Sequence, residues 1–152
     1  MGFFSTFEKQ LDGKRRIVVP QEYRAQVTGP FDGVFCFPAI TADCIEGGSQ
    51  PLFDRYQALI EELPFGDPLR DDLETTVFGG LVRLSFDTAG RIILPDALCE
   101  EFGIETDVAL VGLGDRFQIW ALDRFKAQRA KARASAREGL AALRNGQRAT
   151  RA

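Results

Sequence analysis

Two ten-residue stretches decide the fold: LDGKRRIVVP at residues 11–20 and FDTAGRIILP at residues 86–95. They align without a gap at an offset of 75 residues. In both, an Asp and an Arg stand four positions apart, before an aliphatic run that ends in Pro. Three turn residues separate the Asp from the Arg, and each set includes a glycine, Gly13 or Gly90. The pattern predicts a strand, a tight turn and a returning strand, and it predicts this unit twice.

The residues around each stretch extend this prediction. Upstream, apolar and polar residues mostly alternate with a period of two, as in a half-buried strand. Downstream, we expect a short helix over residues 21–27 and its counterpart over residues 96–102, with Gly103 as the residue that follows the second helix. Further strands are expected at residues 34–37, 108–111 and 116–120.

The segment between the two units reads as mostly helical from residue 41 to residue 80. One helix is expected from Ser49 to about Leu63, and another from Asp67 to Gly79. The chain is therefore predicted to divide into a first repeat (7–51), a helical connector (52–80), a second repeat (81–125) and a basic tail (126–152).

Charge is divided unevenly along the chain. The formal net charge is −3, from 19 Lys and Arg against 22 Asp and Glu. Residues 126–152 contain eight Lys and Arg residues and one Glu, so this tail carries a formal charge of +7 and the rest of the chain carries −10. Because a negative field repels phosphates, DNA binding by residues 1–125 requires clustered Lys and Arg side chains or many copies of the chain acting together. Three interpretations of the tail stay open: a solvated end, a sequence-independent phosphate contact and an oligomerisation arm.

The composition excludes several kinds of chemistry. The chain has no histidine, which excludes Ser-His-Asp and Cys-His catalysis and His-ligated metals. Its three cysteines, at no metal spacing, are expected to be buried and reduced in a cytoplasmic protein. No apolar run is long enough to cross a membrane, and the N-terminus lacks the pattern of a secretory signal. We expect no metal, no cofactor and no small-molecule substrate.

The repeated Asp-x-x-x-Arg has a structural and a functional interpretation. Across a hairpin tip the two side chains become neighbours and form an ion pair. Such a surface pair adds only about 0–1 kcal/mol, so stability is a weak reason to have it in both repeats. In the functional interpretation, the guanidinium reads guanine O6 and N7 in the major groove and the carboxylate orients it. The candidate DNA-binding residues are Asp12, Lys14, Arg15, Arg16, Asp87 and Arg91.

These units, at this spacing, resemble the MraZ family of bacterial transcriptional regulators, which have two tandem SpoVT-AbrB domains. The resemblance covers about residues 7–125. It implies an α+β fold: two AbrB-like β-rich repeats in a swapped-hairpin, double-psi-like barrel, with a helical connector and a basic C-terminal helix or tail. It also implies a cyclic homo-oligomer that is nucleoid-associated and binds double-stranded promoter DNA. That DNA would contain short G-rich direct repeats, upstream of a cell-division and cell-wall gene cluster.

The resemblance carries over residue by residue, with two departures. Asp12, Arg16, Asp87 and Arg91 match the family's DNA-contacting motif. The family usually has glycine where Arg15 stands, so the shape of the first turn and the choice of Arg15 or Arg16 as the base-contacting residue stay open. Residues 27–34 are short compared with their counterpart, which predicts an abbreviated or missing strand.

Two alternatives belong to other functional classes. One is an AbrB-like scaffold that binds protein, for instance as the antitoxin-type partner of a toxin. The other is a hydrolase with Asp12 and Asp87 as paired carboxylates, which would have to lie about 3 Å apart and share a proton. An Arg beside each carboxylate keeps both ionised and argues against the hydrolase. We therefore expect a protein that is not an enzyme.

Overall fold

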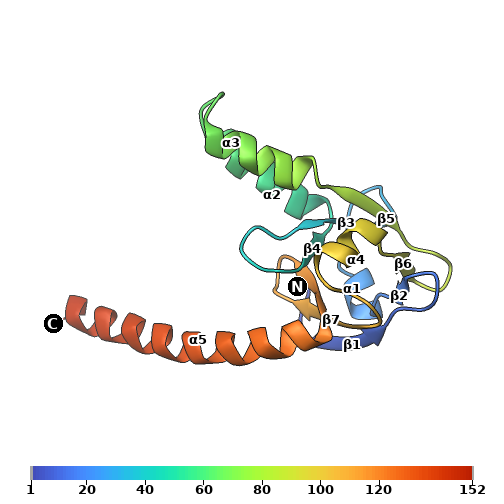
Figure 1. The fold of residues 1–152 in the computed structure, drawn as a ribbon. Coiled ribbons are helices and arrows are strands. Elements are labelled where there is room, and N and C mark those ends of the chain that lie inside the picture. The colour runs from blue at the N-terminus through green and yellow to red at the C-terminus, as the bar shows by residue number, and fades with distance from the viewer. Residues whose placement is uncertain (1, 152) are drawn as a thin grey trace. The chain divides into compact units, whose positions relative to one another are not determined.

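The computed structural model describes residues 2–151 of the chain, and the side chains of residues 2–146 (Figure 1). The chain divides into two compact units, one up to residue 121 and one from residue 122 onward. The first unit contains eight strands and several short helices, and the second is one helix. The predicted α+β class, with β-rich repeats, connecting helices and a C-terminal helix, is confirmed.

The elements follow the repeat in the sequence. The first repeat contains β1 (Thr6–Gln10), β2 (Arg16–Val18), α1 (Gln21–Arg24), β3 (Gly33–Pro38) and β4 (Ile45–Gly48). The second contains β5 (Val82–Ser85), β6 (Arg91–Ile93), α4 (Asp96–Glu101), β7 (Asp107–Gly112) and β8 (Phe117–Ala121). Between them lie α2 (Gln50–Glu61), α3 (Pro68–Leu73) and the π-helical segment η1 (Glu74–Phe78), and after them comes α5 (Leu122–Arg151).

The two repeats exchange strands. Six strands form an antiparallel sheet in the order β1-β7-β8-β4-β3-β5, so β1 pairs with β7 of the other repeat and β3 with β5. The returning strands β2 and β6 pair with each other in a separate two-stranded sheet, called the ribbon below. Each repeat therefore completes the sheet of the other. The boundaries of the repeats, and the barrel that the resemblance implies, stay predictions.

The core lies where the repeats interlock. Ile17 and Ile92, at the centre of the ribbon, are fully buried, as are Val19 and Leu94 at the same positions of the two repeats. Tyr23 is buried beside them and donates a hydrogen bond to the carbonyl of Ser5 at 2.7 Å. The inner side of the ribbon is therefore fixed to the body, and only its outer side is left to meet a ligand.

The short helices that follow the ribbon differ in how they end. Helix α1 stops at Arg24, before the expected end near Val27, because the amides of Gln26 and Val27 donate to carbonyls three residues back instead of four. Helix α4 ends as predicted, with Gly103 at a φ of 65°. The amide of the next residue, Ile104, then donates to the carbonyl of Cys99 at 2.8 Å, closing a Schellman motif.

The prediction for residues 41–80 is wrong at its start. Residues 45–48 form the buried strand β4 between β3 and β8, and the helices begin only at Gln50. The first repeat thus has its own β3–β4 hairpin. Strand β3 has six residues, as its counterpart β7 has, so the expectation of an abbreviated or missing strand at residues 27–34 is also wrong. A Cβ at Gly47 would lie 2.6 Å from the ring of Phe117, so glycine lets this strand lie against the ring. Neither glycine nor Glu46 predicts a strand.

The connector helices cover a second, smaller core, and helix α5 forms the C-terminal tail. Phe37, Leu52, Ile60 and Val77 form a second buried cluster under the connector. The tail is helical in α5 rather than irregular; Ala152 and the side chains of Arg148 and Arg151 lie outside the described residues. Within residues 2–151, no helix combines the length and apolar character needed to cross a bilayer.

Candidate nucleic-acid interface

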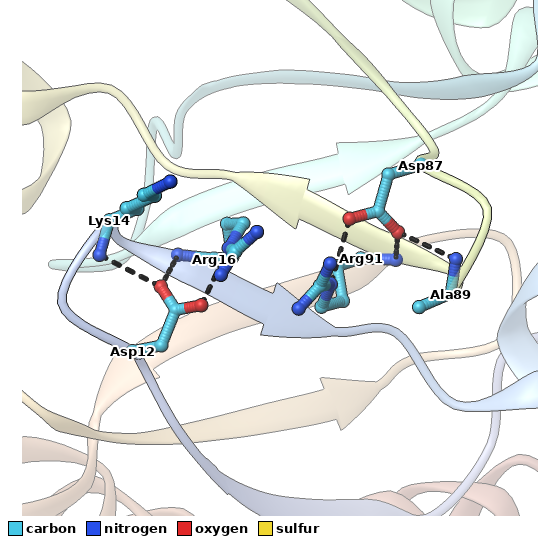
Figure 2. Close-up of polar contacts among 6 residues, drawn as sticks. All are labelled: Asp12, Lys14, Arg16, Asp87, Ala89 and Arg91. Carbon is cyan, nitrogen blue, oxygen red and sulfur yellow. Dashed lines mark hydrogen bonds and ion pairs between the residues drawn. The ribbon is translucent and has the colours of Figure 1, made fainter.

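The first loop is organised around the carboxylate of Asp12 (Figure 2). Its Oδ1 accepts hydrogen bonds from the backbone amides of Lys14 and Arg16, each at 2.9 Å. Its Oδ2 accepts from Nε of Arg16 at 2.6 Å. The amide of Asp12 donates to the carbonyl of Arg16 at 3.1 Å. One carboxylate therefore sets the turn and orients the guanidinium, so that the two Nη nitrogens are the atoms that a ligand would meet.

The second loop repeats this arrangement around Asp87. Oδ1 accepts from the amides of Ala89 and Arg91 at 2.9 and 2.8 Å, and Oδ2 accepts from Nε of Arg91 at 2.7 Å. The amide of Asp87 donates to the carbonyl of Arg91 at 2.9 Å. Each of these bonds has its counterpart 75 residues earlier. The pairing of Asp and Arg that the sequence predicts is present in both loops.

Both turns require one residue in the left-handed region. Position 15 has a φ of 58° and position 90 has a φ of 75°, and the amide of each donates to the carbonyl of its loop's Asp at 3.0 Å. Arg15 thus takes the conformation for which Gly90 is suited, while Gly13 does not. The side chain of Arg15 forms an ion pair with Asp96 at the start of α4. Arg16, and not Arg15, is therefore the counterpart of Arg91.

A backbone amide is the largest single cause that stabilises the charge of each aspartate. The amide of Arg16 is the largest cause that lowers the pKa of Asp12, to about 2, and the guanidinium and the amide of Lys14 lower it further. The pKa of Asp87 is lowered in the same way, first by the amide of Arg91. Both carboxylates thus stay ionised at neutral pH, as a brace for a cation requires.

The ribbon brings the two arginines onto one face. In its register Ile17 pairs with Ile92, and these buried residues point inward. Because side chains alternate along a strand, Arg16 and Arg91 point to the opposite, outer face. They are diagonal neighbours, for which a separation of about 7–8 Å is typical. Figure 2 shows both at the middle of the ribbon, between the two aspartates, and about 30% of each side chain is exposed.

The two loops differ in the charges beside this face. The first loop has Lys14 where the second has Ala89. Arg24 of α1 supplies a cation to the second loop: its Nε donates to the carbonyl of Val19 at 3.1 Å, and a Cβ at Gly90 would lie 2.6 Å from its guanidinium. Sequence reasoning missed Arg24, because no motif connects it with a turn so far along the chain.

The arrangement differs from that of a paired-carboxylate hydrolase. Asp12 and Asp87 stand at the outer ends of the ribbon in Figure 2, each bonded to the arginine of its own loop. A pair that shares a proton has one pKa raised, whereas here both are lowered. The three cysteines are buried as predicted, and burial raises the pKa of Cys36 to about 12. No group of three or more metal-ligating side chains occurs among the residues that the structure describes.

The structure thus defines two strand-exchanged repeats with a braced pair of arginines on one ribbon face, and comparison with known proteins gives the family. A family model described as "MraZ protein, putative antitoxin-like" matches residues 77–145. A protein named transcriptional regulator MraZ from Caulobacter vibrioides is 66% identical over 149 residues, which cover 98% of this chain and 96% of that protein. Proteins of the same name from Phenylobacterium zucineum and Rickettsia bellii are 68% and 40% identical, over 98% and 94% of this chain and 93% and 97% of theirs. The chain belongs to the MraZ family of transcriptional regulators.

Proposed function

We propose that this protein regulates transcription by inserting the outer face of the ribbon into the major groove of promoter DNA. The observation that carries the proposal is the pair of braced, part-exposed guanidiniums of Arg16 and Arg91 on one face. A two-stranded ribbon fits the major groove, and an arginine fork matches O6 and N7 of guanine. Because both arginines lie on one ribbon, they read neighbouring base pairs of one groove segment.

The remaining candidate residues have supporting roles in this proposal. Asp12 and Asp87 orient the two forks, and Lys14 contacts a phosphate beside the groove. Arg15, paired with Asp96, contributes positive charge to the first loop and does not contact bases. These roles account for all six residues that the sequence singles out.

The finer parts of the proposal come from the family and from symmetry. The target is a set of short G-rich direct repeats in the promoter of a cell-division and cell-wall gene cluster, through which the protein controls its own expression in the nucleoid. Copies of the chain form a cyclic ring, whose neighbouring subunits face DNA in the same rotational sense and so meet direct repeats. Several weak contacts linked in this way allow an acidic body to bind DNA.

Helix α5 supports a further, sequence-independent contact. Its bases Lys126, Arg129, Arg133 and Arg137 are spaced three, four and four residues apart, which places them along one side of the helix. A truncation after Phe125 tests this contact. Lost DNA affinity with an intact oligomer supports a phosphate contact, and dissociation of the oligomer supports an oligomerisation arm instead.

The decisive experiment is a gel shift with the DNA upstream of the protein's own gene. Arg16→Ala and Arg91→Ala should each weaken specific binding by about 1–3 kcal/mol without unfolding the protein. Asp87→Ala should weaken specific binding less, because it removes the carboxylate that orients the guanidinium of Arg91 but leaves the guanidinium in place. Arg55→Ala is the matched control, since Arg55 is also ion-paired with an aspartate, Asp115, but lies on α2. Unchanged binding by both ribbon variants at fixed salt would overturn the proposal.

The same experiment separates DNA binding from the protein-scaffold alternative. Binding through phosphates weakens steeply as salt rises, whereas a largely apolar protein interface does not respond in this way. Size-exclusion chromatography with light scattering, run on the same samples, measures the oligomer. A monomer that binds the DNA with full affinity would contradict the ring.

A further inference from the structure

The outer face of the ribbon also carries two exposed aliphatic side chains. Val18 is 42% exposed and Ile93 is 58% exposed, although their neighbours in the strands, Ile17 and Ile92, are completely buried. Val18 and Ile93 occupy the same position in the two repeats, 75 residues apart. The ribbon, with only three residues in each strand, thus places an exposed β-branched residue at equivalent positions of its two strands.

The register places each aliphatic side chain directly beside an arginine. Arg16 pairs with Ile93, and Val18 pairs with Arg91. Directly opposite residues of an antiparallel pair lie on the same face, with Cβ atoms about 4.5–5.5 Å apart. The outer face is therefore a square of two guanidiniums and two aliphatic groups, in which each guanidinium has one aliphatic neighbour across the strands.

This square fits a base edge better than a phosphate or a protein partner. A phosphate offers nothing to an aliphatic side chain, whereas the major-groove edge of thymine carries a C5 methyl group beside the O4 acceptor. A stable protein interface uses about 20–30 residues a side, far more than this ribbon offers. A guanidinium next to an aliphatic group matches a guanine next to a thymine.

We propose that Val18 and Ile93 determine specificity by contacting the C5 methyl groups of thymines next to the guanines that Arg16 and Arg91 read. The inference rests on the proposed function and adds a second base to each contact. The spacing agrees, because cross-strand neighbours lie about one to two base-pair steps of about 3.4 Å apart. Each arginine and its aliphatic neighbour would then recognise a guanine and an adjacent thymine, which lie on the same DNA strand or on opposite DNA strands.

Deoxyuridine provides the test, because it differs from thymidine only by the missing methyl group. The duplex used is the bound segment upstream of the protein's own gene, with each thymine replaced in turn. At one or more positions, wild-type affinity should fall about three- to five-fold, as expected for one buried methyl group. Val18→Thr and Ile93→Thr keep a β-branched residue and so keep the strand. Each variant should discriminate less than the wild type between the thymine and the uracil duplex at its own position, because a hydroxyl replaces one of the two aliphatic branches at Cβ while threonine keeps a methyl group as the other.

The controls distinguish this inference from the proposed function. Lys14→Ala should weaken binding to both duplexes by the same factor and leave their ratio unchanged. If Arg16→Ala and Arg91→Ala lose binding while no uracil position matters, the methyl contact is wrong and the proposed function stands. If uracil affects the Thr variants as much as the wild type, Val18 and Ile93 are not the contacting groups. A change of oligomer size in Val18→Thr would assign this face to an interface between copies and overturn the inference. If the wild type and all variants bind any DNA alike, both proposals fail.

Discussion

The two hairpin loops have the same backbone but different residues at the turn. In each loop five hydrogen bonds join the Asp to the turn and to the Arg, and they correspond one to one. Yet the residue in the left-handed region is Arg15 in the first loop and Gly90 in the second. A glycine is thus not what defines the turn. The carboxylate that accepts two backbone amides and one guanidinium defines it, and the turn residue adapts.

A second difference concerns the space beside the left-handed residue, which is glycine only in the second loop. The guanidinium of Arg24 lies against Gly90, in the space that a side chain at position 90 would need. The residue equivalent to Arg24 in the second repeat is Cys99 of α4. It lines a hollow together with Arg15 of the first loop. Each turn thus has a guanidinium beside it. At the second turn it belongs to Arg24 of helix α1, and at the first turn it belongs to Arg15 of the turn itself.

The largest effect on stability is expected at Gly90. Gly90→Ala puts a Cβ on a residue with a φ of 75°, and it should lower the free energy of unfolding by about 1–2 kcal/mol. The guanidinium of Arg24, at the end of a flexible side chain, has to move aside, so adding Arg24→Ala should restore only a small part of the loss. Gly13→Ala is the matched control, because a Cβ there meets nothing within 4 Å and its φ is not in the left-handed region. Chemical denaturation measures all three, and equal losses at positions 13 and 90 would refute the comparison.

A smaller effect is expected at the equivalent position of the first loop. Arg15→Gly and Arg15→Ala both remove the ion pair with Asp96, but only glycine relieves the left-handed backbone. The glycine variant should therefore be more stable than the alanine variant by about 0.5–1 kcal/mol, after the entropy of glycine is counted. Asp96→Ala measures the ion pair by itself. An alanine variant as stable as the glycine variant would mean that the turn carries no strain.

The loops also show how far sequence reasoning reaches. The pairing of Asp12 with Arg16 was predictable because it is local and because the whole unit occurs twice. The exchange of strands between repeats was not predicted in detail, since the alternation of a strand does not name its partner. Strand β4 was missed because its glycines, Gly47 against Phe117 and Gly48 against Leu52, carry no strand signal. The exposure of Val18 could not be predicted either, because an aliphatic residue in a strand is normally taken to be part of the core.

The charge difference between the loops predicts a reciprocal effect on salt dependence. Lys14→Ala should lower the slope of log affinity against log salt by about 0.9, the contribution of one phosphate contact. Ala89→Lys should raise the slope by a similar amount, because it gives the second loop the charge of the first. Neither change should alter the preferred sequence. Titrations at several salt concentrations on one duplex measure both slopes. A Lys14→Ala effect confined to one DNA sequence would instead place Lys14 against a base.

The smallest effect concerns the charge of the braces themselves. The pKa of Asp12 is lowered to about 2 from an ordinary value of 3.8, so the folded state favours the ionised carboxylate. Its contribution to stability is therefore complete above pH 3.8 and is lost as the pH falls toward 2. Asp12→Asn should remove this loss. Because backbone amides are the leading cause in both loops, Arg16→Ala should leave the pKa of Asp12 below 3.8. A carboxyl NMR titration measures it. A return to the ordinary value would show that the guanidinium supports the carboxylate, and that the two are a mutual ion pair and not a brace built by the turn.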